Sequence, residues 1–103
     1  MSDRLTQLKS LLEADPNDPF CLYGLAQEYA KAGDHAQAIE FYDRTIAADK
    51  TYCYAWFHKA RSQEALDQMD EAASTLREGL DAAKACGDAQ AIGEISGYLD
   101  SIT

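Results

Sequence analysis

Residues 19–52, PFCLYGLAQEYAKAGDHAQAIEFYDRTIAADKTY, and residues 53–86, CYAWFHKARSQEALDQMDEAASTLREGLDAAKAC, are two copies of one pattern. The second copy follows the first directly, so the period is 34 residues. Small and large apolar residues recur at the same positions in both copies. The matched pairs are Ala26 with Ala60, Ala38 with Ala72, Leu22 with Trp56, and Tyr42 with Leu76. This repetition decides the fold class.

A period of this length is typical of stacked helical hairpins. Two short amphipathic helices cannot bury their apolar stripes alone, so neighbouring hairpins stack and share one core. Leucines upstream continue the pattern in phase, which indicates the second helix of an incomplete earlier repeat. They are Leu5, Leu8, Leu11 and Leu12.

The two copies resemble the tetratricopeptide repeat (TPR). That family has an aromatic residue, Leu-Gly and Tyr on its first helix, and small and aromatic residues on its second helix. The matching residues are Leu22, Leu25, Ala26, Tyr29, Ala38 and Tyr42 in the first copy, and Trp56, Ala60, Ala72, Leu76 and Gly79 in the second. The resemblance covers about residues 4–86 and implies an all-α, right-handed TPR-type superhelix, with the first helices lining a concave face.

We therefore expect one TPR-like domain over residues 1–103, with five helices. Its parts are a half-repeat helix over 3–14, repeat 1 over 19–52, repeat 2 over 53–86 and a C-terminal capping helix over 89–101.

Start and stop signals divide the chain between these helices. Asp18 followed by Pro19 is typical of a helix start, because the carboxylate can cap the first turn and proline lacks an N–H that would be unpaired there. Gly33 is a stop signal, and Asp34 can cap the next helix. For the helix that begins near residue 53, the sequence indicates Thr51 as the cap.

Two residues depart from the family pattern on the first helix of repeat 2. Lys59 and Gln63 stand where the family has apolar residues. A lysine is costly to bury unless its amine reaches water. Either this helix is partly exposed or its interior is more polar than usual, and we favour exposure.

The charge of the chain limits its partners. The net charge is −9 at pH 7. Proteins that bind nucleic acids or anionic membranes use clustered Lys and Arg side chains to neutralise the negative charge of these partners. We therefore expect no nucleic-acid or membrane partner, and a neutral or basic protein partner. Met1–Ser10 lacks the basic and apolar regions of a signal peptide, and no apolar run approaches about 20 residues, so we expect a cytoplasmic protein.

The residues that usually carry catalysis or bind metals are scattered. Cys21, Cys53 and Cys86 are widely spaced, and we interpret them as reduced thiols that pack as small apolar residues. Neither His35 nor His58 has a second ligand at i+3 or i+4. We expect no catalytic, metal or cofactor site.

The TPR resemblance implies which residues line the concave face. The candidate peptide-binding residues are Phe20, Tyr23, Gln27, Lys31, Tyr54, Phe57, His58, Arg61 and Glu64. Tyr, Phe and Arg are enriched where interfaces are anchored. The clamp that some relatives use for a C-terminal carboxylate is not expected, because Tyr23, Gln27 and His58 stand at its positions.

Two functions remain open. The chain is either an interaction module or adaptor that binds a peptide segment of a partner on this face, or a structural module that forms a homodimer. The aromatic residues also have a purely structural interpretation, in which they pack on neighbouring helix ends.

Overall fold

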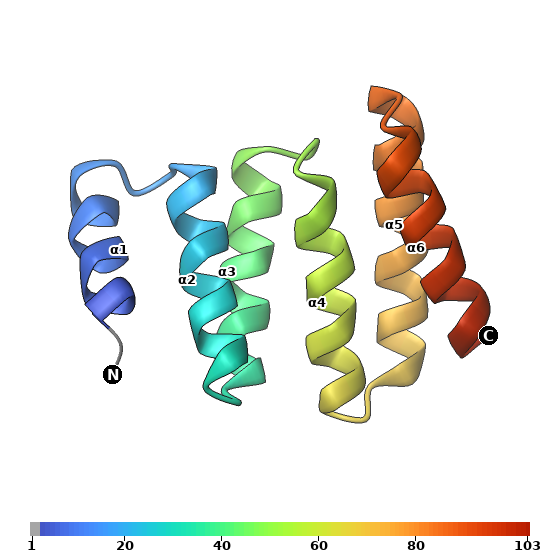
Figure 1. Cartoon of the computed structure of the whole chain (residues 1–103), viewed down its shortest axis with the longest axis horizontal. Coiled ribbons are helices and arrows are strands. Elements are labelled where there is room, and N and C mark those ends of the chain that lie inside the picture. The colour runs from blue at the N-terminus through green and yellow to red at the C-terminus, as the bar shows by residue number, and fades with distance from the viewer. Residues whose placement is uncertain (1–2) are drawn as a thin grey trace.

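The computed structural model describes residues 3–103, which form helices joined by short turns, with no strand in that range. The helices are α1 (Asp3–Ala14), α2 (Pro19–Lys31), α3 (His35–Ala48), α4 (Cys53–Ala65), α5 (Met69–Cys86) and α6 (Ala89–Ile102). They stand side by side in chain order, with α2 in front of α3 and α6 in front of α5 (Figure 1). The molecule is a slab measuring 38 × 29 × 18 Å.

The all-α TPR-type fold is confirmed, but the expected number of five helices is wrong. The described residues form six helices, which is the sum of the expected parts, two helices in each repeat and one at each end. Each hairpin buries its apolar stripes against the next one. The sequence α2–α3–α4–α5–α6 is therefore a continuous stack, with α1 covering α2 at one end.

Aspartates cap three of the helices. The Asp18 carboxylate accepts a hydrogen bond from the Phe20 amide at 3.1 Å, and Asp34 and Asp88 cap α3 and α6 in the same way. Gly33 lies between α2 and α3 with φ of 83°, a backbone conformation that favours glycine. These local signals fix where the hairpins turn.

The cap expected at Thr51 is wrong. Tyr52 occupies the N-cap position of α4 and makes no side-chain cap hydrogen bond. The Thr51 hydroxyl instead donates to the Asp49 carboxylate at 2.6 Å, one turn before the helix begins.

Small residues let the helices approach closely in the core. Ala26, Ala38 and Ala55 are fully buried where α2, α3 and α4 meet. Gly79 of α5 faces Trp56 of α4 so closely that an added Cβ would lie 2.5 Å from the Trp56 Cβ. The recurring small residues of the sequence are thus contact points between helices.

The terminal helices each bury one face. In α1, Leu5 and Leu8 pack with Leu25 of α2, whereas Leu11 is 56% exposed and lies outside the expected leucine stripe. In α6, Ile95 is buried in the core of repeat 2. One-sided packing is what the ends of a helical stack require.

Lys59 and Gln63 have different environments, and the exposure that we favoured fails for Gln63. Gln63 is buried, and its side-chain oxygen accepts a hydrogen bond from the Thr75 hydroxyl at 2.7 Å. The Lys59 amine reaches Asp43 at 2.6 Å, with 18% of the Lys59 side chain exposed. Repeat 2 therefore buries one hydrogen-bonded polar pair, Gln63 with Thr75, beside an apolar core.

Candidate interaction site on the α2/α4 face

An aromatic row runs across α2, α4 and α6. In order, it consists of Tyr52, Tyr23, His58, Phe57 and Tyr98. The successive ring centroids are 4.8, 6.0, 5.3 and 5.3 Å apart, mostly in tilted or edge-on arrangements. Such spacings are favourable for aromatic pairs. The row joins both repeats and the last helix into one surface that is only partly buried.

The four predicted aromatic residues differ in exposure and in the rings that they contact. Tyr23 and Phe57 belong to the row, and Tyr54 contacts the Phe57 ring edge-on at 6.4 Å. Phe20 is 61% exposed, and none of the ring contacts recorded for residues 3–103 includes it. Phe20 and Tyr23 stand at the positions of repeat 1 that Tyr54 and Phe57 occupy in repeat 2, but only Tyr54 and Phe57 contact each other.

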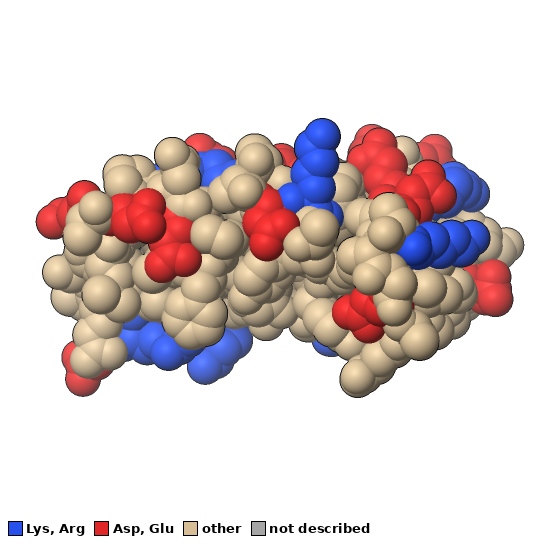
Figure 2. Space-filling view, turned by 90° about the horizontal axis from the view of Figure 1, so that it is seen from above, with Lys and Arg blue, Asp and Glu red and all other residues tan. Residues whose placement is uncertain are grey.

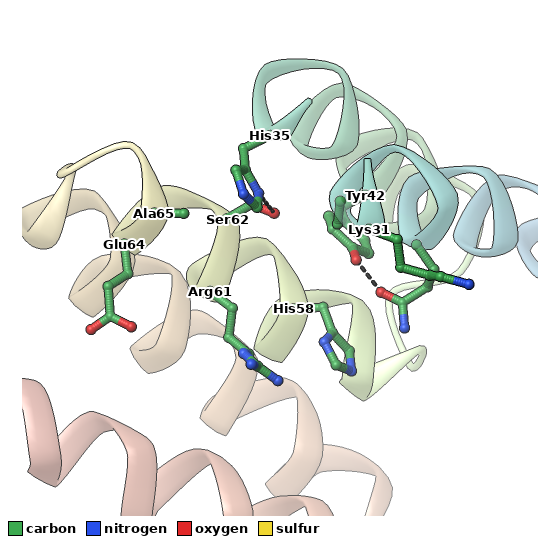
Figure 3. A pocket seen from close by; sticks show the side chains of 10 residues that line it. Lys31, His35, Tyr42, His58, Arg61, Ser62, Glu64 and Ala65 are labelled. Carbon is green, nitrogen blue, oxygen red and sulfur yellow. Dashed lines mark hydrogen bonds between the residues drawn. The ribbon is translucent and has the colours of Figure 1, made fainter. Parts of the chain in front are cut away.

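A polar pocket adjoins the row, with a volume of about 500 Å³. It lies between α2 and α4, over the first turns of α3, and His58 borders both the pocket and the row (Figure 3). Its lining residues are Gln27, Ala30, Lys31, His35, Tyr42, His58, Arg61, Ser62, Glu64 and Ala65. Five of the nine predicted site residues thus line one cavity.

Hydrogen bonds hold the pocket walls together. The Tyr42 hydroxyl donates to the Gln27 side-chain oxygen, joining α3 to α2. His35 Nδ1 and Ser62 Oγ lie 3.1 Å apart, joining α3 to α4 (Figure 3). Three helices are therefore fixed around the cavity before any ligand arrives, which lowers the ordering cost of binding.

Burial disfavours the charged forms of the site's titratable rings. Burial, followed by the neighbouring Tyr52 and Tyr54 hydroxyls, raises the pKa of Tyr23 to about 12. Burial also raises the pKa of Tyr42 well above its ordinary value. For His58, burial and then the nearby Arg61 guanidinium lower the pKa below 6.5. These rings can therefore offer apolar faces and neutral hydrogen-bonding groups to a ligand.

Charged side chains of both signs lie around the α2/α4 face. Seen from the end where α2 and α4 begin, acidic side chains are spread along the molecule, with Lys and Arg side chains among them (Figure 2). Asp18 and Asp49 precede α2 and α4 at this end. The pocket near the other end is lined by Lys31 and Arg61, with Glu64 as its carboxylate. The pocket is thus lined by two cations and one carboxylate, although the whole chain is acidic.

The ionic groups of the pocket differ in how they are engaged. The Lys31 amine lies 3.7 Å from the Glu28 carboxylate on the same helix. The Glu64 carboxylate accepts a hydrogen bond from the Tyr98 hydroxyl at 2.9 Å, which ties α4 to α6. Arg61 is exposed, extends away from α4 (Figure 3) and has no ion pair with another described residue.

Sequence reasoning missed three aromatic residues. Tyr42 appeared only as a repeat position, although it lines the pocket. Tyr52 and Tyr98 were not considered, because one precedes a helix and the other lies on a helix interpreted as a cap. The sequence does carry a signal for Tyr98. It lies one repeat period of 34 residues after Glu64, which is a predicted site residue and the hydrogen-bond partner of Tyr98.

The described residues contain no group of three or more His, Cys, Asp or Glu side chains arranged to hold a metal ion. Within residues 3–103, none of the helices has the length and apolar character needed to cross a bilayer.

Helical hairpins stacked in line, with an aromatic and polar face over their first helices, define a helical-repeat protein. The family model described as anaphase-promoting complex, cyclosome, subunit 3 matches residues 2–79. The chain belongs to this family, which is of the TPR type.

Known proteins share this fold. A TPR repeat-containing protein of Pseudomonas aeruginosa is 27% identical over 92 residues, covering 89% of this chain and 88% of the relative. The solution structure of a tetratricopeptide repeat domain protein from Salinibacter ruber has a TM-score of 0.79 and 28% identity, covering 85% of this chain and 89% of that one. PcrH, solved in complex with the chaperone binding region of PopD, has a TM-score of 0.88 at 20% identity, covering 95% of this chain and 74% of that one.

Proposed function

We propose that the chain is a protein-interaction module that binds a peptide segment of a partner protein along the aromatic row, with one side chain of the peptide in the polar pocket. The continuity of the row with a preformed pocket carries the proposal. Proteins of this fold generally act as scaffolds rather than enzymes, and PcrH is seen with a segment of PopD.

The two parts of the face suit different parts of a peptide. The aromatic row offers half-buried rings on which apolar side chains can pack. Lys31 and Arg61 favour a polar or acidic side chain in the pocket. The net charge of −9 favours encounter with a partner that is neutral or basic overall, and this attraction weakens as salt rises.

The experiment is a selection from a displayed library of random 12-residue peptides, followed by affinity measurements on the selected sequences. Three variants report on the site: Phe57→Ala in the row, Arg61→Glu in the pocket and Phe20→Ala at the exposed position. Arg77→Glu is the matched control, because Arg77 is also exposed but does not line the pocket.

We expect peptides of micromolar affinity that lose about tenfold or more with Phe57→Ala and Arg61→Glu, since one such anchor contributes over 1 kcal/mol. Arg77→Glu should leave affinity within about twofold of the wild type. Selected peptides that bind Arg61→Glu and Arg77→Glu equally well, or no enrichment at all, would overturn the proposal. Phe20→Ala decides whether Phe20 belongs to the site.

A second copy of the chain is the alternative occupant of this face. Its motivation is Phe20, an apolar side chain that is 61% exposed at the first turn of α2. Light scattering across a concentration series separates the two cases. A dimer that Phe20→Ala abolishes would assign the face to self-association, and a monomer at every concentration would exclude it.

A further inference from the structure

Two cysteines that are far apart in sequence meet at one edge of repeat 2. Cys53 is the first residue of α4 and Cys86 is the last residue of α5. Their sulfurs lie 3.6 Å apart. All three cysteines are free thiols, and Cys21 and Cys53 are buried as the sequence interpretation expects, whereas Cys86 is exposed and does not pack as a small apolar residue. Cys21 lies apart from this pair, near Asp18.

The surroundings give the two thiols different access to solvent. Cys53 is buried, with its thiol close enough to donate to the Thr51 carbonyl oxygen at 3.3 Å. Cys86 is exposed, and its sulfur lies 3.5 Å from the Ala83 carbonyl oxygen. A reagent in solution therefore reaches the Cys86 sulfur first. Cys53 can then react only with the group that has become bound to the Cys86 sulfur.

We propose that Cys53 and Cys86 are a dithiol that forms a reversible intramolecular disulfide on exposure to a low-molecular-weight disulfide such as oxidised glutathione. The Cys86 thiol loses its proton to water, and its sulfur attacks one sulfur of the reagent, releasing one glutathione thiolate. The Cys53 sulfur, also deprotonated, then attacks the Cys86 sulfur and releases the second thiolate. The two cysteines are oxidised by two electrons, and one glutathione disulfide is reduced to two glutathione molecules, which take up the two protons.

The order of attack follows from the exposure of Cys86 and the burial of Cys53, and the raised pKa of the Cys53 thiol agrees with it. Burial, and then the neighbouring Cys86 sulfur, raises the pKa of the Cys53 thiol to about 11. Cys53 is thus a thiol near neutral pH and a slow nucleophile toward solution reagents. Its proximity to Cys86 compensates in the second step, because an intramolecular attack proceeds at a high effective concentration.

The disulfide would close a ring around the whole of repeat 2. It would link the start of α4 to the end of α5, directly before Asp88 caps α6. Linking residues this far apart restricts the unfolded chain, so the oxidised protein should unfold at a temperature about 10 °C or more above the reduced protein. Oxidation would therefore stabilise the repeat that carries Tyr54, Phe57 and His58 against unfolding.

The test incubates the reduced full chain with oxidised glutathione and maps the products by mass spectrometry. Trypsin separates the three cysteines into residues 10–31, 51–59 and 85–103. We expect the intact mass to fall by two hydrogens, with a link between 51–59 and 85–103 that a reducing agent removes. Glutathione added to single cysteines without this link, or dimers linked through Cys86, would overturn the proposal.

Single variants test the order of steps. Cys53→Ala should trap glutathione on Cys86, because the second thiol is missing. Cys86→Ser should leave Cys53 unmodified, because burial shields it. Cys21→Ala is the matched control and should form the 53–86 link at an unchanged rate. Glutathione on Cys53 in the Cys86→Ser protein, with helicity intact by circular dichroism, would contradict the assigned order.

Discussion

Thr75 donates a hydrogen bond of 2.7 Å to the side-chain oxygen of Gln63, and both residues are buried between α4 and α5. Gln63 stands where the family pattern has an apolar residue. Repeat 2 tolerates this buried polar residue because the Gln63 side-chain oxygen in α4 has a hydrogen-bond donor, the Thr75 hydroxyl, in α5. Each group therefore depends on the other for its hydrogen-bonding partner.

Replacing one member of this pair by an apolar residue should lower the free energy of unfolding more than replacing both members. Gln63→Leu leaves the Thr75 hydroxyl without its partner and should lower the free energy of unfolding by about 1–3 kcal/mol. Gln63→Leu combined with Thr75→Val removes both polar groups and should recover much of that loss. Urea unfolding of the wild type, both single variants and the double variant gives the coupling. Strictly additive losses would show that the hydrogen bond is not what matters at this site.

The glycines of α5 and α6 should respond to alanine in opposite directions. At Gly79 the new Cβ would meet Trp56, so Gly79→Ala should destabilise the fold by about 1–3 kcal/mol through overpacking. At Gly93 nothing lies within 4 Å of an added Cβ, so Gly93→Ala should stabilise α6 by up to about 1 kcal/mol. Thermal unfolding by circular dichroism measures both. Equal effects at the two positions would refute the close α4/α5 contact.

The helix caps provide a third comparison. Asp34 accepts a hydrogen bond from the Gln37 amide at 3.2 Å, so Asp34→Ala should lower stability by about 0.5–2 kcal/mol. Thr51 does not cap α4, and Thr51→Ala removes only an exposed contact with Asp49, so its effect should stay within about 0.5 kcal/mol. Urea denaturation under identical conditions compares them. A larger loss of stability for Thr51→Ala than for Asp34→Ala would indicate that Thr51 caps α4, as the sequence indicated.

Local chemistry explains why so much of the fold was predictable. The repetition of Ala26 at Ala60 and of Ala38 at Ala72 reflects contacts that recur between hairpins, so sequence alone carries them. Asp18 and Gly33 act through their own backbone neighbours, which are also visible in the sequence. Features set within one turn of a helix, or repeated by the period, need no knowledge of the tertiary structure.

The candidate site was less predictable because it depends on which side chains meet across helices. Phe20 and Tyr54 occupy equivalent positions of the two repeats, yet of these two only Tyr54 meets another ring among the described residues. Tyr98 comes from a helix that the repeat pattern treats as a cap. The contact between Cys53 and Cys86 joins opposite ends of repeat 2. Such pairings depend on the distance and angle between packed helices, which the repeat pattern does not specify.

His58 should make stability depend on pH in the mildly acidic range. Its pKa in the folded chain lies below the ordinary value of 6.5, chiefly because of burial and then because of Arg61. The unfolded chain therefore binds the proton more tightly, and the contribution of neutral His58 is fully present above pH 6.5 and is lost as the pH falls toward its folded pKa. His58→Gln lacks this group, so its stability should fall less than that of the wild type between pH 8 and pH 5. Urea midpoints measured across that range test the effect, and a constant difference between the two proteins would mean that His58 does not titrate differently in the folded and unfolded chains.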